Sequence, residues 1–312
     1  MGEFDLIRRF FQRPAAAGVE VGVGDDCAVL VPTPGARWLV SSDMLVEGRH
    51  FLSTVDPARL GHKALAVNLS DLAACGATPR GFTLALALPR ADEAWLAGFA
   101  QGLWALADAS GIPLVGGDTT QGPLNLCITV FGEAPPGQAL LRSGARVGDE
   151  VWVSGQLGDA RLALEVFRGT VALAGEAFEQ VRRAMELPTP RLGLGQALRG
   201  VATAALDISD GLLGDLGHLL AASQVGATLD LEALPRSPVL AAQPQAVQQA
   251  CLLAGGDDYE LVFTAPKGVR LPDVGVPLTR IGRIDAEPGL RVVDARGAPV
   301  AHGLQSFDHF KT

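Results

Sequence analysis

The chain has 312 residues, a length typical of two ordinary domains or one large one. Hydrophobic residues make up 48% of it and charged residues 19%, so it can bury a core and is not disordered. The net charge of −9 argues against nonspecific binding to nucleic acid or to anionic membranes, because both need a basic surface. No apolar run approaches the roughly 20 residues of a membrane span, so we expect neither nucleic acid nor membrane as a partner.

The cysteines and the N-terminal segment indicate the compartment. Cys27, Cys75, Cys127 and Cys251 are far apart and form no Cys-x-x-Cys pair, which is typical of single thiols in a reducing environment. Residues 2–5 carry acids where a signal peptide carries bases. We therefore expect a cytoplasmic protein.

Strands and helices alternate along the chain. Short apolar runs that end in small residues and an aspartate predict strands entering turns, at residues 19–23, 38–40, 112–115, 201–206 and 250–254. Helical patterns lie between them, at residues 57–75, 92–110, 158–168, 191–199 and 211–223. In the first of these, Asn68 and Asp71 share one face, away from an apolar stripe. Residues 236–249 are expected to form a surface stretch, and residues 290–300 a late hairpin.

A proline- and glycine-rich stretch marks the middle of the chain. It begins at Ala134, and a polar Arg-Ser-Gly segment follows it from Arg142. Such exposed segments are typical of domain boundaries, so we place two domains at residues 1–140 and 141–312. Both halves mix strands and helices, which predicts an α+β fold class.

The common nucleotide-binding motifs are missing. There is no G-x-x-x-x-G-K-[ST] segment, which excludes a Walker A phosphate cradle. Neither glycine pair, at 22 and 24 or at 193 and 195, has the third glycine of a dinucleotide fingerprint. With three lysines in the chain, little phosphate chemistry can depend on lysine.

The remaining indication of function comes from aspartates at predicted strand ends and turns. They are Asp25, Asp26, Asp43, Asp71, Asp118, Asp207, Asp210, Asp257 and Asp258. Clustered carboxylates repel one another unless cations lie between them, and Mg²⁺ prefers oxygen ligands. The set therefore favours a multi-magnesium phosphate site. The alternative is that each aspartate is a turn former or a helix cap, as Asp210 would be if it capped a helix beginning at Gly211.

Two further residues can be assigned in two ways. Arg142 can bind a phosphate through its guanidinium group, although a solvated arginine is the commoner case. His50 follows the Asp43 segment and is more often a structural histidine than a ligand. The sequence leaves both alternatives open.

Several segments together resemble a known family. They are residues 22–28, 63–74, 116–120, 141–145, 207–212, 255–261 and 307–310. In this order they resemble the thiamine-monophosphate kinase family, over essentially the whole chain. The most specific of them are Asn68–Ala73 and Asp257–Leu261. The superfamily also contains aminoimidazole ribonucleotide synthetase.

The resemblance implies a reaction, a fold and a set of ligands. It implies ATP-dependent phosphorylation of thiamine monophosphate to thiamine diphosphate, with several Mg²⁺ ions. It also implies a two-domain α+β fold of the aminoimidazole ribonucleotide synthetase type, whose N-terminal sheets pair in a homodimer. The metal ligands it implies are Asp26, Ser41, Ser42, Asp43, Asp71, Asp118, Asp207 and Asp210. The implied ATP contacts are Gly117, Asp118, Arg142 and Ser209, and the implied substrate contacts are His50, Asp257 and Phe307.

No catalytic base is assigned, because the acceptor oxygen of a phosphate is already anionic and in-line transfer depends on alignment and metals. The chain departs from the family at Asp257, where Glu is usual, and at Ser42, where Thr is common. Two other functions stay open: a sister ATP-dependent enzyme of the superfamily, and a noncatalytic module that binds nucleotide or thiamine phosphate.

Overall fold

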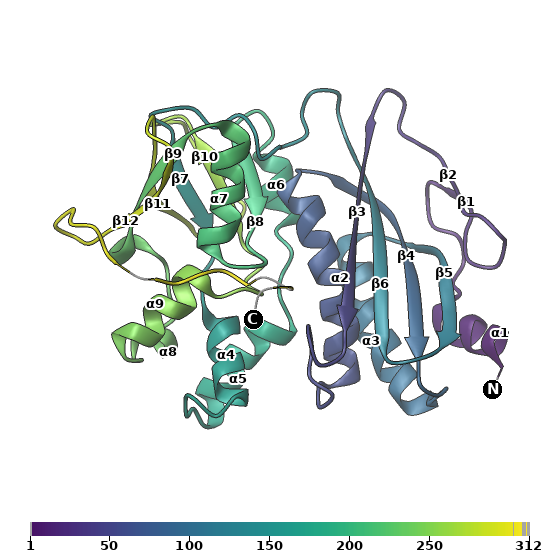
Figure 1. Cartoon of the computed structure of the whole chain (residues 1–312). Helices are drawn as coiled ribbons and strands as arrows, with labels where there is room; N and C mark the ends of the chain where they lie inside the picture. Colours follow the sequence, from purple (N-terminus) through teal and green to yellow (C-terminus); the bar gives the residue numbers. More distant parts are fainter. Residues whose placement is uncertain (1, 302, 308–309, 311–312) are drawn as a thin grey trace. The chain divides into compact units, whose positions relative to one another are not determined.

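The computed structural model describes residues 2–301, 303–307 and 310. It divides the chain into two compact units (Figure 1). The first comprises Met1–Leu72 and Ala77–Gly137, and the second comprises Ala73–Gly76 and Gln138–Thr312. Each unit mixes helices with a sheet, and the predicted α+β class is confirmed.

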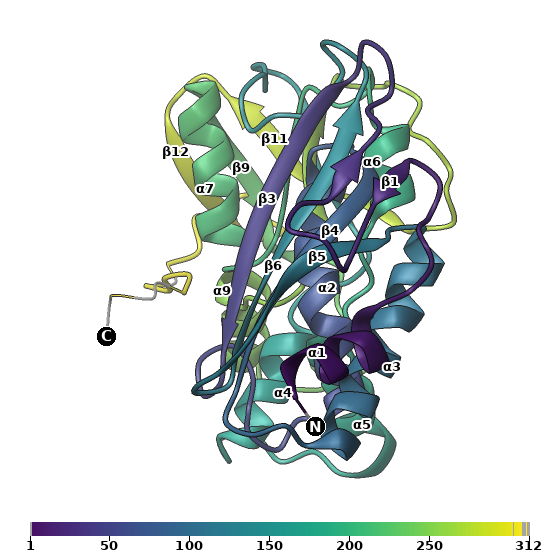
Figure 2. The ribbon, with the colours of Figure 1, turned by 90° about the vertical axis from the view of Figure 1, so that its right-hand side faces the viewer.

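The first unit is a four-stranded sheet with helices on one face (Figure 2). Its elements are α1 (Glu3–Leu6), the π-helical turn Ile7–Phe11, β1 (Val19–Val21), β2 (Val29–Leu30), β3 (Arg37–Val46), α2 (Pro57–Ala74), β4 (Thr78–Leu88), α3 (Glu93–Ser110), β5 (Leu114–Gln121) and β6 (Asn125–Ala134). The strand order is β3-β6-β4-β5, and β1 and β2 form a separate two-stranded sheet.

The two faces of this sheet differ. Leu126, Ile128 and Val130 of β6 are buried on the face that α2 and α3 cover. On the other face Val40 and Met44 of β3 are more than half exposed, at 59% and 55%. The outer face of β3 is therefore an uncovered apolar surface within this unit.

Glycines allow α2 and α3 to pack closely. A Cβ atom at Gly102 would lie 1.7 Å from the carbonyl oxygen of Ala58, and one at Gly61 would lie 2.0 Å from that of Phe99. No other residue fits either position without moving a helix. The apolar stripe predicted for α2 is confirmed, since Leu65, Leu69 and Leu72 are at most 1% exposed.

The second unit is a six-stranded sheet with helices on both faces (Figure 1). Its elements are β7 (Glu150–Ser154), α4 (Asp159–Phe167), α5 (Gly175–Glu186), α6 (Leu192–Ala197), β8 (Ala204–Asp207), α7 (Leu212–Ser223), β9 (Gly226–Asp230), the 3₁₀ turn Leu231–Ala233, α8 (Pro238–Ala241), α9 (Gln245–Ala254), β10 (Leu261–Ala265), β11 (Leu278–Asp285) and β12 (Gly289–Val293). The order is β12-β9-β11-β7-β10-β8, antiparallel except between β12 and β9.

Strand β10 lies in the core of this unit. Val262 belongs to an apolar cluster with residues of α4, α7 and α9, whereas Leu261 and Phe263 belong to a second cluster with residues around α6. Because side chains alternate along a strand, the two clusters lie on opposite faces of the sheet. Burial on both faces explains why β10 is a continuous apolar run.

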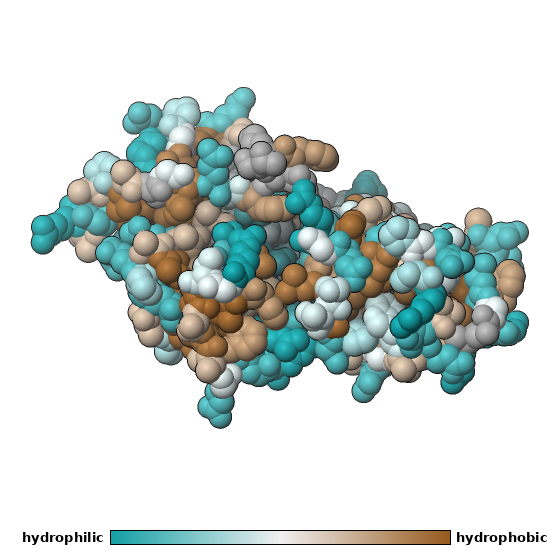
Figure 3. Space-filling view, turned by 60° about the horizontal axis from the view of Figure 1, so that its bottom comes forward, coloured by the Kyte–Doolittle hydropathy of each residue, from teal (hydrophilic) through white to brown (hydrophobic). Residues whose placement is uncertain are grey.

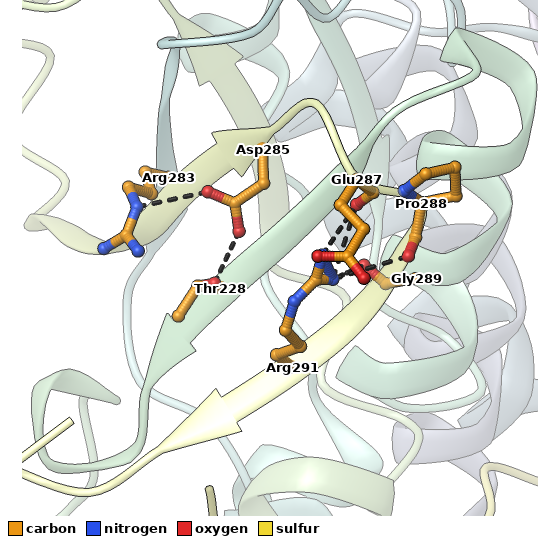
Figure 4. A network of polar contacts seen from close by, with 7 residues as sticks. All are labelled: Thr228, Arg283, Asp285, Glu287, Pro288, Gly289 and Arg291. Atoms are coloured by element: carbon orange, nitrogen blue, oxygen red, sulfur yellow. Dashed lines mark hydrogen bonds and ion pairs between the residues drawn. The ribbon is translucent and has the colours of Figure 1, made fainter. Parts of the chain in front are cut away.

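A polar network fixes the edge formed by β9, β11 and β12 (Figure 4). The carboxylate of Asp285 accepts hydrogen bonds from the hydroxyl of Thr228 and from Nε of Arg283. The guanidinium group of Arg291 covers the carbonyl oxygens of residues 287–289 and closes the turn before β12. This network stabilises the edge of the sheet opposite β8.

One prediction of secondary structure in the second unit was wrong, and two were confirmed. Residues 250–254 form the end of α9 and not a strand, because a five-residue apolar run has no period that separates the two. Residues 236–249 lie at the surface as predicted, since all except Ser237 and Leu240 are at least partly exposed, and they contain α8 and the beginning of α9. The predicted late hairpin is confirmed: Val293 and Pro299 form an antiparallel bridge, and the N–H groups of Val300 and Asp294 donate to the carbonyl oxygens of Val292 and Ala298, both at 2.9 Å.

The surface shows no segregation by hydropathy on the face drawn in Figure 3, where hydrophobic and hydrophilic residues are interspersed. Within the part of the chain that the structure describes, no helix has both the length and the apolar character needed to cross a membrane.

Candidate functional site

In the first unit, predicted metal ligands lie on β3 and on the helix behind it. The hydroxyl of Ser41 donates a hydrogen bond to the carboxylate of Asp71 in α2. One turn earlier in α2, the Oδ1 atom of Asn68 accepts the backbone N–H of Asp43 at 3.0 Å. The predicted shared face of Asn68 and Asp71 is confirmed, since both contact β3. The structure therefore brings Ser41, Asp43 and Asp71 together.

Ser42 lies on the opposite face of β3. Its Oγ is 2.9 Å from Oγ1 of Thr129, 3.2 Å from the carbonyl oxygen of Ile128 and 3.3 Å from Sγ of Cys127. Because successive side chains alternate, the side chains of Ser41 and Ser42 cannot both bind one ion on the same face of the sheet.

Asp43 and Asp118 lie within strands, and the prediction that they follow strand ends was wrong. Asp43 is central in β3 and pairs with Ile128, while Asp118 is central in β5 and pairs with Ala85. The sheet ladder overrides the turn preference of these Ser-Asp and Gly-Asp segments. Gly117 is required there, because a Cβ atom would lie 1.9 Å from the carbonyl oxygen of Leu84.

Asp26 and His50 occupy loops of the same unit. Asp26 is exposed between β1 and β2, and its backbone N–H is bound by the carboxylate of Asp25. Nδ1 of His50 accepts the backbone N–H of Val46 at 2.9 Å. This bond supports a structural role of Nδ1.

In the second unit, backbone hydrogen bonds join three predicted segments. Asp207 is the last residue of β8, and the loop at residues 207–211 leads into α7. The carbonyl oxygen of Ser209 accepts the N–H of Asp257 at 2.8 Å. The carbonyl oxygen of Asp210 accepts the N–H of Phe307 at 3.1 Å. The unit thus gathers Asp207, Ser209, Asp210, Asp257 and Phe307, from segments up to 100 residues apart.

The C-terminal segment is held by a residue that sequence reasoning missed. The hydroxyl of Ser306 accepts the N–H of Gly214 at 2.8 Å and donates to the carbonyl oxygen of Gly211 at 3.2 Å. Ser306 thereby fixes the neighbouring Phe307 beside the loop at residues 207–211. Asp308 and His309, which belong to the same family segment, lie outside the described residues.

The loop at residues 255–260 has an unusual backbone. Asp257 and Tyr259 both have positive φ, at 68° and 50°, a conformation that costs side-chain-bearing residues energy. Between them, the carboxylate of Asp258 accepts the N–H of Gly158 at 2.9 Å, and burial raises its pKa well above the ordinary value. Asp257 and Asp258 therefore point in different directions. The Tyr259 hydroxyl donates to Oδ1 of Asp257 at 3.1 Å.

A buried carboxylate supports the loop at residues 207–211. Oδ2 of Asp215, in the first turn of α7, accepts the backbone N–H groups of Ser209, Asp210 and Gly211 at 3.1, 3.0 and 2.9 Å. Burial raises the pKa of Asp215 to about 6, as does the nearby charge of Asp210, against the lowering effect of these hydrogen bonds. Asp210 does not act as the side-chain cap of α7, whose N-cap is Gly211.

Arg142 lies apart from this group. Its carbonyl oxygen accepts the hydroxyl of Ser223, the last residue of α7, at 2.9 Å. Ser209 precedes the first turn of the same helix, and a helix of 12 residues is about 18 Å long. Within this unit, the backbone of Arg142 and that of Ser209 thus lie at opposite ends of α7.

The oxygen-rich side chains suit Mg²⁺ better than a softer metal. Among the described residues, however, no three acids, histidines or cysteines lie close enough together to hold a metal ion. The first unit also contains a cavity of about 600 Å³, bounded by residues 12–23 and the end of α3. None of the predicted metal, ATP or substrate residues lines this cavity, so it does not support the predicted site.

The comparisons define the class of protein. Residues 24–134 match the model of the AIR synthase related protein N-terminal domain, and residues 146–295 match that of the C-terminal domain. The two domains, in this order, are those of an AIR synthase related protein, and the predicted fold is confirmed.

The relatives identify the family within that class. The thiamine-monophosphate kinase of Salmonella typhimurium (strain LT2) is 46% identical over 100% of this chain and 99% of its own length. The crystal structure of thiamine-monophosphate kinase from Stenotrophomonas maltophilia K279a is 44% identical, with a TM-score of 0.85 over 91% of this chain and 93% of that one. A solved complex of AaThiL with AMPPCP and TMP is 30% identical, with a TM-score of 0.80 over 90% and 89% of the two chains. The chain belongs to the thiamine-monophosphate kinase family.

Proposed function

We propose that this protein transfers the terminal phosphoryl group of ATP directly to thiamine monophosphate, giving ADP and thiamine diphosphate. The observation that carries the proposal is the 46% identity to thiamine-monophosphate kinases over the whole chain. The gathering of the loops at 207–211 and 255–260 with Phe307 supports it, because a bisubstrate reaction needs nucleotide and acceptor contacts in one place.

Magnesium is the cofactor that the oxygen side chains fit. Bound Mg²⁺ would supply positive charge that reduces the repulsion between two anionic substrates. The residues proposed to hold it are Asp26, Ser41, Ser42, Asp43, Asp71, Asp118, Asp207 and Asp210. Ser41 and Ser42 lie on opposite faces of β3, which supports more than one ion.

The chain's own residues would bind and orient the substrates. Gly117, Asp118, Arg142 and Ser209 are proposed to contact ATP, and His50, Asp257 and Phe307 to contact thiamine monophosphate. The carboxylate of Asp257 can offset the thiazolium charge or accept a hydrogen bond from the aminopyrimidine. The half-exposed ring of Phe307 offers an apolar surface to the same ligand.

A steady-state assay of ADP release, with and without thiamine monophosphate, tests the function. We expect release that depends on both thiamine monophosphate and Mg²⁺. Release that needs a different acceptor would indicate a sister enzyme of the superfamily. Binding of both ligands without release would indicate a noncatalytic module.

The proposed transfer forms no phosphoenzyme. The aspartates that could accept a phosphoryl group are assigned to metal binding, and His50 has its Nδ1 bound to the backbone. Labelled ATP should leave no label on the quenched protein. A stoichiometric labelled phosphoprotein would contradict in-line transfer.

A homodimer would cover the exposed outer face of β3. Trp38, Val40 and Met44 form an apolar row that remains 42%, 59% and 55% exposed in the single chain. Such a row on an edge strand is typical of a face that pairs with another sheet. Light scattering at micromolar concentration should give the mass of two chains, and W38D/M44D should shift it toward one.

The two domains would share these tasks. Domain 1–140 would supply metal and ATP contacts and the dimer surface, and domain 141–312 would complete the nucleotide and substrate contacts. A cytoplasmic location is supported by the four free cysteines, one of them exposed. Fractionation of cells expressing the tagged chain tests the location.

A further inference from the structure

The buried carboxylate of Asp215 binds the backbone N–H groups that precede α7. Oδ2 of Asp215 accepts three consecutive backbone N–H groups, and the residue is 5% exposed. A fourth N–H of the first turn, that of Gly214, is bound by Ser306. A helix beginning usually attracts external anions because its N–H groups are unpaired. Here the carboxylate of Asp215 already accepts hydrogen bonds from these N–H groups.

This arrangement decides what the loop can offer a ligand. With their N–H groups directed at Asp215, residues 209–211 cannot use those same groups to bind a phosphate. The loop can contact ligands through the side chains of Ser209 and Asp210, and through Asp207 at the end of β8. The buried charge of Asp215 also favours a loop that binds cations rather than bare anions.

We propose that Asp215 is a positioning residue, which holds the loop at residues 207–211 in the conformation that directs Asp207, Ser209 and Asp210 toward the metal-nucleotide substrate. The inference rests on the proposed function for the identity of that ligand, but the support of the loop by Asp215 is independent of it. Residues that orient metal ligands in this way typically contribute ten- to hundredfold to metal affinity or activity.

The test compares D215A and D215N with a matched aspartate of the same unit. Asp285 also accepts two side-chain hydrogen bonds, but it lies on β11, in the network at the edge of the sheet remote from β8 (Figure 4). D285A therefore measures the general effect of removing a hydrogen-bonded carboxylate. Mg²⁺ is titrated calorimetrically into each protein saturated with AMPPCP, and amide hydrogen exchange is followed at residues 209–211.

We expect D215A to weaken Mg²⁺ binding about ten- to hundredfold and to speed exchange at residues 209–211. D215N should show smaller changes in the same direction, because a neutral amide oxygen is a weaker acceptor than a carboxylate. D285A should leave Mg²⁺ binding and exchange in that loop unchanged, whatever its effect on thermal stability.

Wild-type Mg²⁺ affinity and exchange in D215A would overturn the proposal, as would an equal loss of affinity in D285A. If D215A does not fold, wild-type behaviour of D215N in both measurements overturns it. Neither measurement uses thiamine monophosphate. A wild-type protein that releases no ADP with that acceptor would remove the proposed function and leave the role of Asp215 to be judged separately.

Discussion

The two units place their candidate residues by different means. In the first unit, Ser41, Asp43 and Asp118 lie in the middle of hydrogen-bonded strands, and Asp71 lies on a helix. In the second unit, Ser209, Asp210, Asp257 and Phe307 lie on loops whose backbone N–H and carbonyl groups bind one another or buried side chains. Regular secondary structure positions the first set, and individual hydrogen bonds position the second.

This difference has consequences for mutation. A strand residue keeps its backbone position when its side chain changes, because the ladder to the neighbouring strand, β6 for β3 and β4 for β5, holds it. A loop with positive φ at Asp257 and Tyr259 has no such ladder and depends on the groups that anchor it. Changes to ligands in the first unit should therefore affect chemistry alone, whereas changes near the loops can alter both binding and local structure.

The largest effect is expected from the aspartates of the first unit. D43N, D71N and D118N should each lower turnover by more than the roughly 10- to 100-fold typical of changes outside the metal ligands themselves. Each variant should keep its thermal stability, and steady-state ADP release measures the loss. D92N is the matched control, since Asp92 of this unit caps α3 and pairs with Arg90 but is not a proposed metal ligand. Near-normal turnover of the three variants as folded proteins would contradict the metal site.

A smaller and more selective effect is expected at Asp257. D257A should raise the KM for thiamine monophosphate about ten- to a hundredfold, as expected for the loss of a charged hydrogen bond of roughly 1.5–3 kcal/mol. The KM for ATP should change little, and D257E should be tolerated because it restores the usual residue of the family. Equal shifts of both constants, or none, would instead support a role of Asp257 in the turn.

Regular patterns were predictable from the sequence, and hydrogen bonds between distant segments were not. The stripe and the polar face of α2 follow from a spacing of three and four residues, and the structure confirms both. The central position of Asp43 in β3 could not be predicted, because it depends on pairing with β6, about 85 residues later in the chain. Asp215 resembled an ordinary acid in the first turn of a helix.

The smallest effect, and the sharpest test of how a loop positions its residues, is expected at the chain's single tyrosine. The hydroxyl of Tyr259 donates to Oδ1 of Asp257, and its ring is buried at 8% exposure. Y259F keeps the ring and removes this bond, so the carboxylate of Asp257 would lose one constraint on its direction. A single hydrogen bond contributes about 0.5–1.5 kcal/mol, which corresponds to a two- to twelvefold rise in the KM for thiamine monophosphate.

A double-mutant cycle separates positioning of Asp257 from a general effect on the loop. If the Tyr259 hydroxyl acts through Asp257, Y259F should change the KM for thiamine monophosphate in the wild-type background and leave it unchanged in D257A. The KM for ATP serves as the internal control. Ser209, a proposed ATP contact, is joined to the loop at residues 255–260 by a hydrogen bond from the backbone N–H of Asp257 to its carbonyl oxygen, and neither substitution removes these backbone groups. Additive effects of the two substitutions would show that Tyr259 supports the loop as a whole, and the hydrogen bond to Asp257 would then have no part in substrate recognition.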